Sequence, residues 1–136
     1  MKTRRCLFAL VLLTAMAFSA CDDDSDGRSR FIGRYEVTEY SLETFSPRDD
    51  YEVRIRKDIA TEDYVVISNF YNLNIDVLAQ VDGNDLLVAE QTHGLLVFEG
   101  SGRLSGNIIV MDYTVTSSQE GSEYFDRLRA EMTFLE

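Results

Sequence analysis

Cysteine, histidine, proline and tryptophan are almost missing from this chain of 136 residues. It contains two cysteines, one histidine, one proline and no tryptophan. Both cysteines, Cys6 and Cys21, fall at the start of the chain, so the remainder has no thiol and cannot form a disulfide. A zinc site of several cysteine or histidine ligands is therefore excluded by composition. Stability must come from packing and from backbone hydrogen bonds.

Positive charge is also scarce. The chain has 13 Lys and Arg against 24 Asp and Glu, a formal net charge of −11. Such a field repels nucleic acid and anionic lipid headgroups. The one basic cluster, Arg54, Arg56 and Lys57, is interleaved with Glu52 and Asp58, which indicates a solvated strand face rather than a phosphate site. We therefore expect no nucleic-acid partner.

Catalytic signatures are missing too. His93, the only histidine, precedes Gly94 in a predicted turn, and the sequence identifies no nucleophile or orienting partner for it. Gly100, Gly102 and Gly106 have the wrong spacing for a phosphate-binding loop, and a strand rather than a helix is expected after them. We therefore expect no enzyme, no cofactor and no metal. A hydrolase with a carboxylate pair stays open as a third hypothesis, because carboxylates are abundant.

What is present begins with a leader, residues 1–20. Its first five residues carry three positive charges, and residues 6–20 are uncharged and mostly apolar. This run is shorter than the ~20 residues that a membrane-spanning helix needs. Small residues, Ser19 and Ala20, precede Cys21. The pattern is typical of a secretory signal peptide cleaved between Ala20 and Cys21.

The segment Phe18-Ser19-Ala20-Cys21 resembles the lipobox of bacterial lipoproteins, with Phe18 where Leu is usual. The resemblance implies that Cys21 is the lipid attachment site: it carries diacylglycerol through a thioether, and its new amino group is acylated, for example by palmitate. Buried acyl chains contribute ~0.8 kcal/mol per methylene, so several chains give a stable anchor. The alternative is an ordinary signal peptide followed by an unmodified Cys21.

An acidic run follows, from Asp22 to Asp26. Its aspartates match the opening of an EF-hand loop, but the twelfth position, which should be Glu, is Gly33. We therefore expect no calcium site. Residues 21–30 are instead predicted to be an acidic tether that holds the domain off the bilayer.

The position of this run also resembles two sorting signals. An acidic run after the lipidated cysteine resembles the export signal of surface lipoproteins in Bacteroidota, which implies lipid anchoring at the outer membrane or cell surface. An Asp after the cysteine also resembles the retention signal of enterobacteria, which implies the inner membrane, facing the periplasm. The length of the run favours the first.

From Phe31 onward the apolar residues alternate with a period of two, which predicts strands. Strands are expected near residues 32–42, 51–56, 64–70, 75–81, 86–91, 95–104, 108–116 and 127–134. Asp82-Gly83-Asn84 and Ser105-Gly106-Asn107 predict tight hairpins. Residues 124–130 could form a helical turn, but their alternation favours a strand.

Eight strands with short connections predict one all-β domain, residues 31–136. The simplest arrangement is an eight-stranded antiparallel meander closed into a barrel, because closure removes exposed edges. A Greek-key β-sandwich is the alternative and would need longer crossovers. Gly33 inside a strand predicts a bend or a close backbone approach.

Gly33-Arg34-Tyr35 resembles the Gly-x-Trp motif of lipocalin-like barrels, with Tyr in place of Trp. Together with the lipobox, the layout is similar to the small lipocalin-like lipoproteins of Bacteroidota. This resemblance implies a binding role rather than catalysis.

Nine residues are best placed to line the barrel interior: Tyr35, Val37, Tyr51, Val53, Val77, Met111, Tyr113, Met132 and Phe134. They either fill a core or line an apolar pocket in which tyrosine hydroxyls orient a ligand. We therefore expect a membrane-anchored, non-catalytic binding module for a small apolar or amphipathic ligand. The alternative is a structural or accessory subunit of an envelope assembly that acts through its outer face, marked by an exposed apolar patch.

Overall fold

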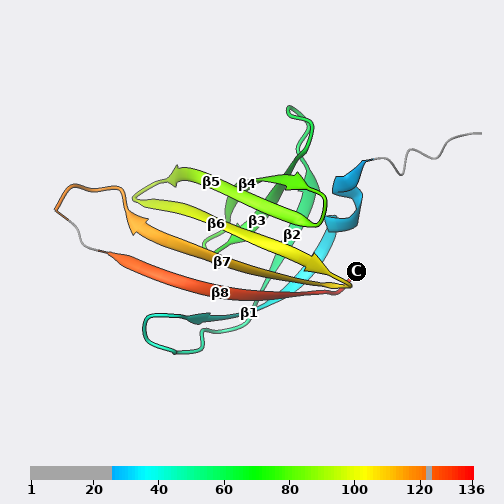
Figure 1. Cartoon of the computed structure of the whole chain (residues 1–136). Coiled ribbons are helices and arrows are strands. Elements are labelled where there is room, and N and C mark those ends of the chain that lie inside the picture. The colour runs from blue at the N-terminus through cyan, green and yellow to red at the C-terminus, as the bar shows by residue number, and fades with distance from the viewer. Residues whose placement is uncertain (1–25, 122–123) are drawn as a thin grey trace, which may run out of the picture.

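The protein is a closed barrel of eight antiparallel strands (Figure 1). The computed structural model describes residues 26–121 and 124–136; the expected signal peptide, Cys21 and the first four aspartate-rich positions after it lie outside these residues. The strands are β1 (Gly33–Ser41), β2 (Tyr51–Lys57), β3 (Tyr64–Phe70), β4 (Ile75–Asp82), β5 (Asp85–His93), β6 (Leu96–Ser105), β7 (Ile108–Ser117) and β8 (Phe125–Phe134).

Every strand pairs with its neighbours in sequence, and β1 pairs with β8 to close the barrel. The predicted eight-stranded meander barrel is therefore confirmed. The Greek-key sandwich is wrong, since the sheet order contains no crossover.

The alternation after Tyr124 correctly predicted a strand rather than a helical turn, because β8 begins at Phe125 and its residues Phe125 to Thr133 pair with β7. One local prediction needs correction. His93 is the last residue of β5 rather than a turn residue, because it pairs with Leu96 across the hairpin.

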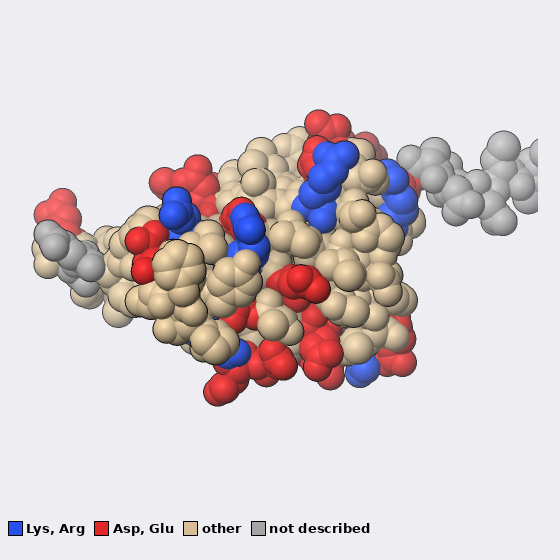
Figure 2. All heavy atoms as spheres, turned by 60° about the horizontal axis from the view of Figure 1, so that its bottom comes forward, with Lys and Arg blue, Asp and Glu red and all other residues tan. Residues whose placement is uncertain are grey.

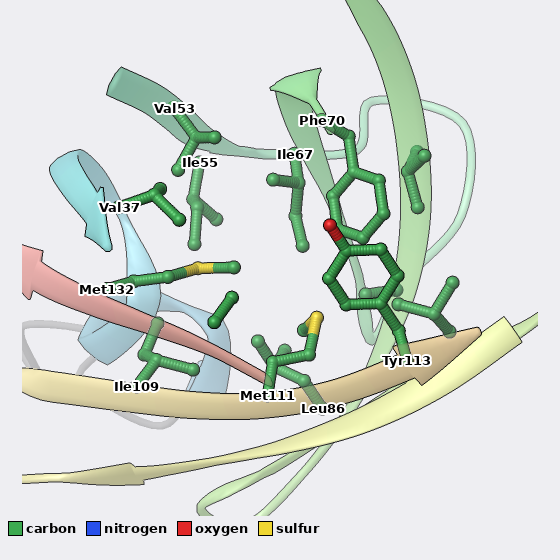
Figure 3. Close-up of a cluster of buried hydrophobic side chains, with 14 of the residues drawn as sticks. Val37, Val53, Ile55, Ile67, Phe70, Leu86, Ile109, Met111, Tyr113 and Met132 are labelled. Carbon is green, nitrogen blue, oxygen red and sulfur yellow. The ribbon is translucent and has the colours of Figure 1, made fainter. Parts of the chain in front are cut away.

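The barrel is filled by the inward-facing side chains of all eight strands. Figure 3 shows side chains from opposite walls, such as Val53, Met111 and Met132, pointing toward one another. These belong to one cluster of buried apolar residues that runs through the interior. An eight-stranded barrel is narrow enough for side chains to fill, so this core accounts for the stability of the fold.

One end of the barrel is closed by the 3-10 helix η1 (Gly27–Phe31). The ring of Phe31 is fully buried. Asp26 caps the helix by accepting a hydrogen bond from the Arg28 amide at 3.0 Å. The Arg28 guanidinium donates to the carbonyls of Asp58 and Tyr64, each at 3.2 Å. Residues 26–30, expected to be tether, therefore belong to the folded unit.

The Gly33-Arg34-Tyr35 motif lies at the same closed end. Gly33 has φ of +149°, and a Cβ there would lie 2.7 Å from the Glu136 carbonyl oxygen and would collide with the Phe134 ring. The predicted close backbone approach is thus confirmed. The Tyr35 hydroxyl donates to the Phe31 carbonyl at 3.0 Å and so ties the strand to η1.

The opposite end carries four connections, those joining β1 to β2, β3 to β4, β5 to β6 and β7 to β8. Figure 1 shows η1 and the C-terminus together at the closed end, away from these connections. We call the end with the four connections the open end.

Candidate functional site

The nine predicted interior residues are found mainly in the core. Seven are buried: Tyr35, Val37, Val53, Val77, Met111, Tyr113 and Met132. Tyr51 is partly buried, and Phe134 is exposed at the rim of the closed end, where its ring packs edge-on against Tyr35 at 5.5 Å between centroids. These side chains pack on one another, and none of them lines the surface hollows described below.

The core also holds a carboxylate that the sequence prediction did not include. Glu39 of β1 is 1% exposed and points inward beside the tyrosines. Its Oε2 accepts hydrogen bonds from the hydroxyls of Tyr51, at 2.8 Å, and Tyr113, at 2.5 Å. Its Oε1 has no hydrogen-bond partner among the described residues and faces the Arg48 guanidinium at 3.5 Å.

The surroundings of Glu39 act on its pKa in opposite directions. Burial raises the pKa of the carboxyl, because the charged form loses its hydration. The two tyrosine hydroxyls and Arg48 favour the carboxylate and offset part of this effect. The net result is a raised pKa, and a buried carboxyl with a perturbed pKa is a physical basis for a functional hypothesis.

Arg48 covers Glu39 from the open end. The connection between β1 and β2 folds back along β1, where the Arg48 amide donates to the Glu39 carbonyl at 2.8 Å and Pro47 bridges to Tyr40. This places the guanidinium 4.1 Å from the centre of the Tyr71 ring, in a cation–π contact. It also lies 3.9 Å from the Asp126 carboxylate.

Further hydrogen bonds fix the groups around Arg48. Ser41 donates to Asp126 at 2.7 Å, and the hydroxyls of Tyr71 and Tyr124 are 2.7 Å apart. Burial and the contact with Tyr124 raise the pKa of Tyr71 to about 12, so its hydroxyl is protonated at neutral pH. The polar groups are thus held in place rather than free to rearrange.

A hollow of about 370 Å³ opens above this arrangement. It is lined by Ser41, Glu43, Thr44, Ser46, Arg48, Tyr71, Tyr124, Phe125 and Asp126. We call it the open-end site. Its size falls within the range of small-molecule sites, and it combines aromatic walls with a few fixed polar groups. This composition suits a ligand that has both an apolar and a hydrogen-bonding part.

The described residues offer neither a metal centre nor a spanning helix. Within residues 26–121 and 124–136, no group of three or more His, Cys, Asp or Glu is arranged to hold a metal ion. No helix in the same ranges is long and apolar enough to cross a bilayer. His93 lies beside Phe98 and within 3.2 Å of the Gln91 side chain.

The sequence contained a signal for Glu39. The inward parity set by Tyr35 and Val37 continues to Glu39 and Ser41, so a carboxylate was due inside the barrel. No local signal places Arg48 or Asp126 beside it, because those contacts depend on the folded-back connection and on the closure of β1 against β8.

No family model matches the chain, and no curated protein or solved structure matches it either.

Proposed function

We propose that this protein is a lipid-anchored envelope lipoprotein whose lipocalin-like barrel binds a small amphipathic ligand at the open-end site, without catalysis. The observation that carries the proposal is the hollow above the buried Glu39, with aromatic walls and a charged, hydrogen-bonded floor. The filled interior favours a ligand held at the end of the barrel rather than deep within it.

The two parts of the ligand have different partners. Its apolar part packs against Tyr71, Tyr124 and Phe125, whose rings face the hollow. Its polar part bonds to the Arg48 guanidinium and to Asp126, the two groups at the floor that are not fully buried. Arg48 is already balanced by Glu39 and Asp126, so a neutral or zwitterionic polar group fits better than a strong anion.

Exposed apolar side chains around the site extend its binding surface. Each of the four connections at the open end, or the strand start beside it, carries one: Phe45, Leu73, Leu95 and Phe125. Isolated exposed apolar residues are common on protein surfaces, but four at one end of the barrel, one of them lining the hollow, favour that end as a binding surface.

The proposed lipid anchor lies near the closed end and so leaves the open end free to receive a ligand from the medium. Cys21 precedes Asp26 by five positions, a reach of at most about 18 Å in extended chain. Asp26 caps η1 at the closed end. A lipid on Cys21 therefore holds the closed end toward the bilayer and the open end away from it, at the outer membrane or cell surface, or alternatively at the inner membrane facing the periplasm.

Binding is tested with a neutral fluorescent probe that has aromatic rings and one N–H group, N-phenyl-1-naphthylamine, added to the mature protein. We expect Phe125→Ser to weaken the probe's fluorescence enhancement several-fold, since it removes an aromatic wall of the site. The matched control is Ile59→Ser, which removes a fully exposed apolar side chain from the connection between β2 and β3 at the closed end. Equal binding by the two variants and the unmodified protein would count against the site.

The anchor is tested separately by labelling cells with palmitate. The protein should incorporate the label, and Cys21→Ala should abolish incorporation. Label that persists in Cys21→Ala would rule out the lipoprotein part of the proposal while leaving the binding part intact.

A second function, that of an accessory subunit acting through its outer face, is favoured by a separate observation. A hollow larger than the open-end site lies on the outside of the barrel wall.

A further inference from the structure

The outer surface of the barrel has a hollow of about 680 Å³ over β4, β5, β6 and β7. It lies on the other side of the barrel wall from the core and shares no lining residue with the open-end site. We call it the outer groove. Whatever it binds is therefore independent of the ligand proposed above.

The register of the strands explains why a hollow forms on a wall that is otherwise convex. One row of outward-facing neighbours runs across the four strands as Gln80, Leu87, Ser101 and Asp112. Ser101 is the shortest side chain in this row and forms the floor, beside Gly102. The next row consists of Asp82, Asp85, Arg103 and Val110.

The walls of the outer groove include two apolar side chains that water reaches. Leu87 of β5 is 51% exposed and Val110 of β7 is 43% exposed. They lie on opposite sides of β6 in the sheet. A partner that covers both would remove apolar surface from water, which is the main source of affinity in most protein contacts.

The charged residues of the groove are mostly acidic. Four aspartates line it, Asp63, Asp82, Asp85 and Asp112, against one arginine, Arg103. Arg103 pairs with Asp85 at 2.8 Å, and Arg129 from β8 pairs with Asp112 at 2.7 Å. These pairs are exposed, so each contributes little to stability and can be exchanged for a pair with an incoming cation.

We propose that the outer groove binds an extended, basic segment of a partner protein, in which Lys or Arg residues flank an apolar residue. The apolar residue packs between Leu87 and Val110, and the cations pair with the surrounding aspartates. A second copy of this chain does not fit, because its net charge of −11 repels the acidic groove. An anionic lipid surface is disfavoured for the same reason.

The size of the groove sets the length of the segment. Four neighbouring strands lie about 14 Å apart from first to last. An extended chain covers that distance with about four residues. A segment of four to six residues therefore reaches from the aspartates of β4 to Asp112 of β7.

The test is a titration of the mature protein, in a zwitterionic detergent, with a synthetic hexapeptide of alternating Lys and Leu. Amide chemical shifts from two-dimensional NMR report the binding site residue by residue. We expect saturable shifts around Leu87, Ser101 and Val110. Leu87→Ser, a change at an exposed position that leaves the core untouched, should weaken binding about tenfold. A Lys-Ser hexapeptide should bind as weakly to the unmodified protein.

Two matched double variants distinguish specific binding in the outer groove from non-specific attraction of a basic peptide to an acidic protein. Asp82 and Asp85 face each other across β4 and β5, just as Glu36 and Glu52 do across β1 and β2. Figure 2 shows that acidic groups also cover other parts of the surface. Asp82→Asn with Asp85→Asn should weaken binding several-fold, and Glu36→Gln with Glu52→Gln should not. Equal effects of the two pairs, an unaffected Leu87→Ser variant, or shifts spread evenly over the surface would overturn the proposal.

Discussion

At the scale of single residues, the free-energy cost of burying the Glu39 carboxylate is offset by three neighbouring side chains. Two tyrosine hydroxyls hold Oε2, and Arg48 faces Oε1. Removing one partner of such a group leaves a buried charge unpaired, which usually costs more stability than the pair contributed. The tyrosines thus serve as donors to the carboxylate as well as core side chains.

The raised pKa of Glu39 has a definite consequence for stability. Its folded-state pKa lies above the ordinary value of 4.5, so between these two values the folded protein binds more protons than the unfolded chain. The contribution of Glu39 to the free energy of unfolding therefore falls as pH rises from 4.5 through the folded-state pKa, and is constant above it.

Glu39→Gln keeps an amide oxygen that can accept from both tyrosine hydroxyls, but it removes the ionisable carboxyl group. We expect the difference in free energy of unfolding between Glu39→Gln and the unmodified protein to shift in favour of the variant as pH rises above 4.5. Urea unfolding at a series of pH values measures it. A difference that is flat with pH, or that shifts in favour of the unmodified protein, would contradict the raised pKa.

At the scale of strands, the seam between β4 and β5 has the shortest pairing among the described strands. Their pairing covers only Gln80 to Asp82 on β4. Beyond it, the Gln91 side chain lies between the strands: its Oε1 accepts from the Leu78 amide at 3.0 Å, and its Nε2 donates to the Leu78 carbonyl at 2.9 Å and to Ala89 at 3.1 Å. The side-chain amide replaces a missing peptide group of a neighbouring strand.

Gln91→Ala should therefore open the seam. It leaves the Leu78 amide and carbonyl without these partners; since both are exposed and water can reach them, the expected cost is the net value of a hydrogen bond, about 0.5–1.5 kcal/mol in free energy of unfolding. The Leu78 amide should also exchange with solvent faster. Gln119→Ala, in the exposed connection after β7, is the matched control and should stay within about 0.5 kcal/mol of the unmodified protein. Unchanged exchange at Leu78 in Gln91→Ala would show that the bridge has no structural role.

The strands and tight turns that depend on a local sequence pattern were predicted correctly. Alternation in Tyr51, Val53 and Ile55 gives β2 its two faces, and Asp82-Gly83-Asn84 supplies the tight connection between β4 and β5. The extra residue in β5 between Val88 and Gln91 was not predicted, because a bulge depends on the register with β6 and not on the local pattern.

The candidate sites depend on contacts that sequence does not encode locally. Tyr113 reaches Glu39 from 74 positions away, and Arg48 reaches Asp126 only because β8 closes against β1. Likewise, the outer groove follows from a cross-strand row in which a short Ser101 lies between longer side chains. Seven of the nine residues predicted to face the interior are buried in the core. Predicting a binding site would also require the register between neighbouring strands.

At the scale of the whole molecule, the two ends of the barrel have different roles in the proposed account. The closed end carries η1 and the C-terminus (Figure 1). The open end carries the hollow above Glu39. An anchor on Cys21 then sets the orientation of the barrel to the bilayer, with the outer groove on its side.

This orientation can be measured, since Cys21 is the only cysteine after the leader. A fluorophore on Ser105→Cys, at the closed end, should be quenched strongly by spin-labelled lipids. One on Ser118→Cys, about 30 Å away along ten-residue strands, should be quenched weakly. Equal quenching, or stronger quenching of Ser118→Cys, would contradict attachment at the closed end.

The central claim is that a small amphipathic ligand binds above Glu39. The most direct measurement is an NMR titration of the mature protein with the same neutral probe, N-phenyl-1-naphthylamine, followed at every assigned amide. The account predicts saturable shifts at Arg48, Tyr71 and Phe125, and their loss in Phe125→Ser. Shifts confined to Leu87 and Val110 on the outer groove, or no saturable shift at the open end, would contradict it.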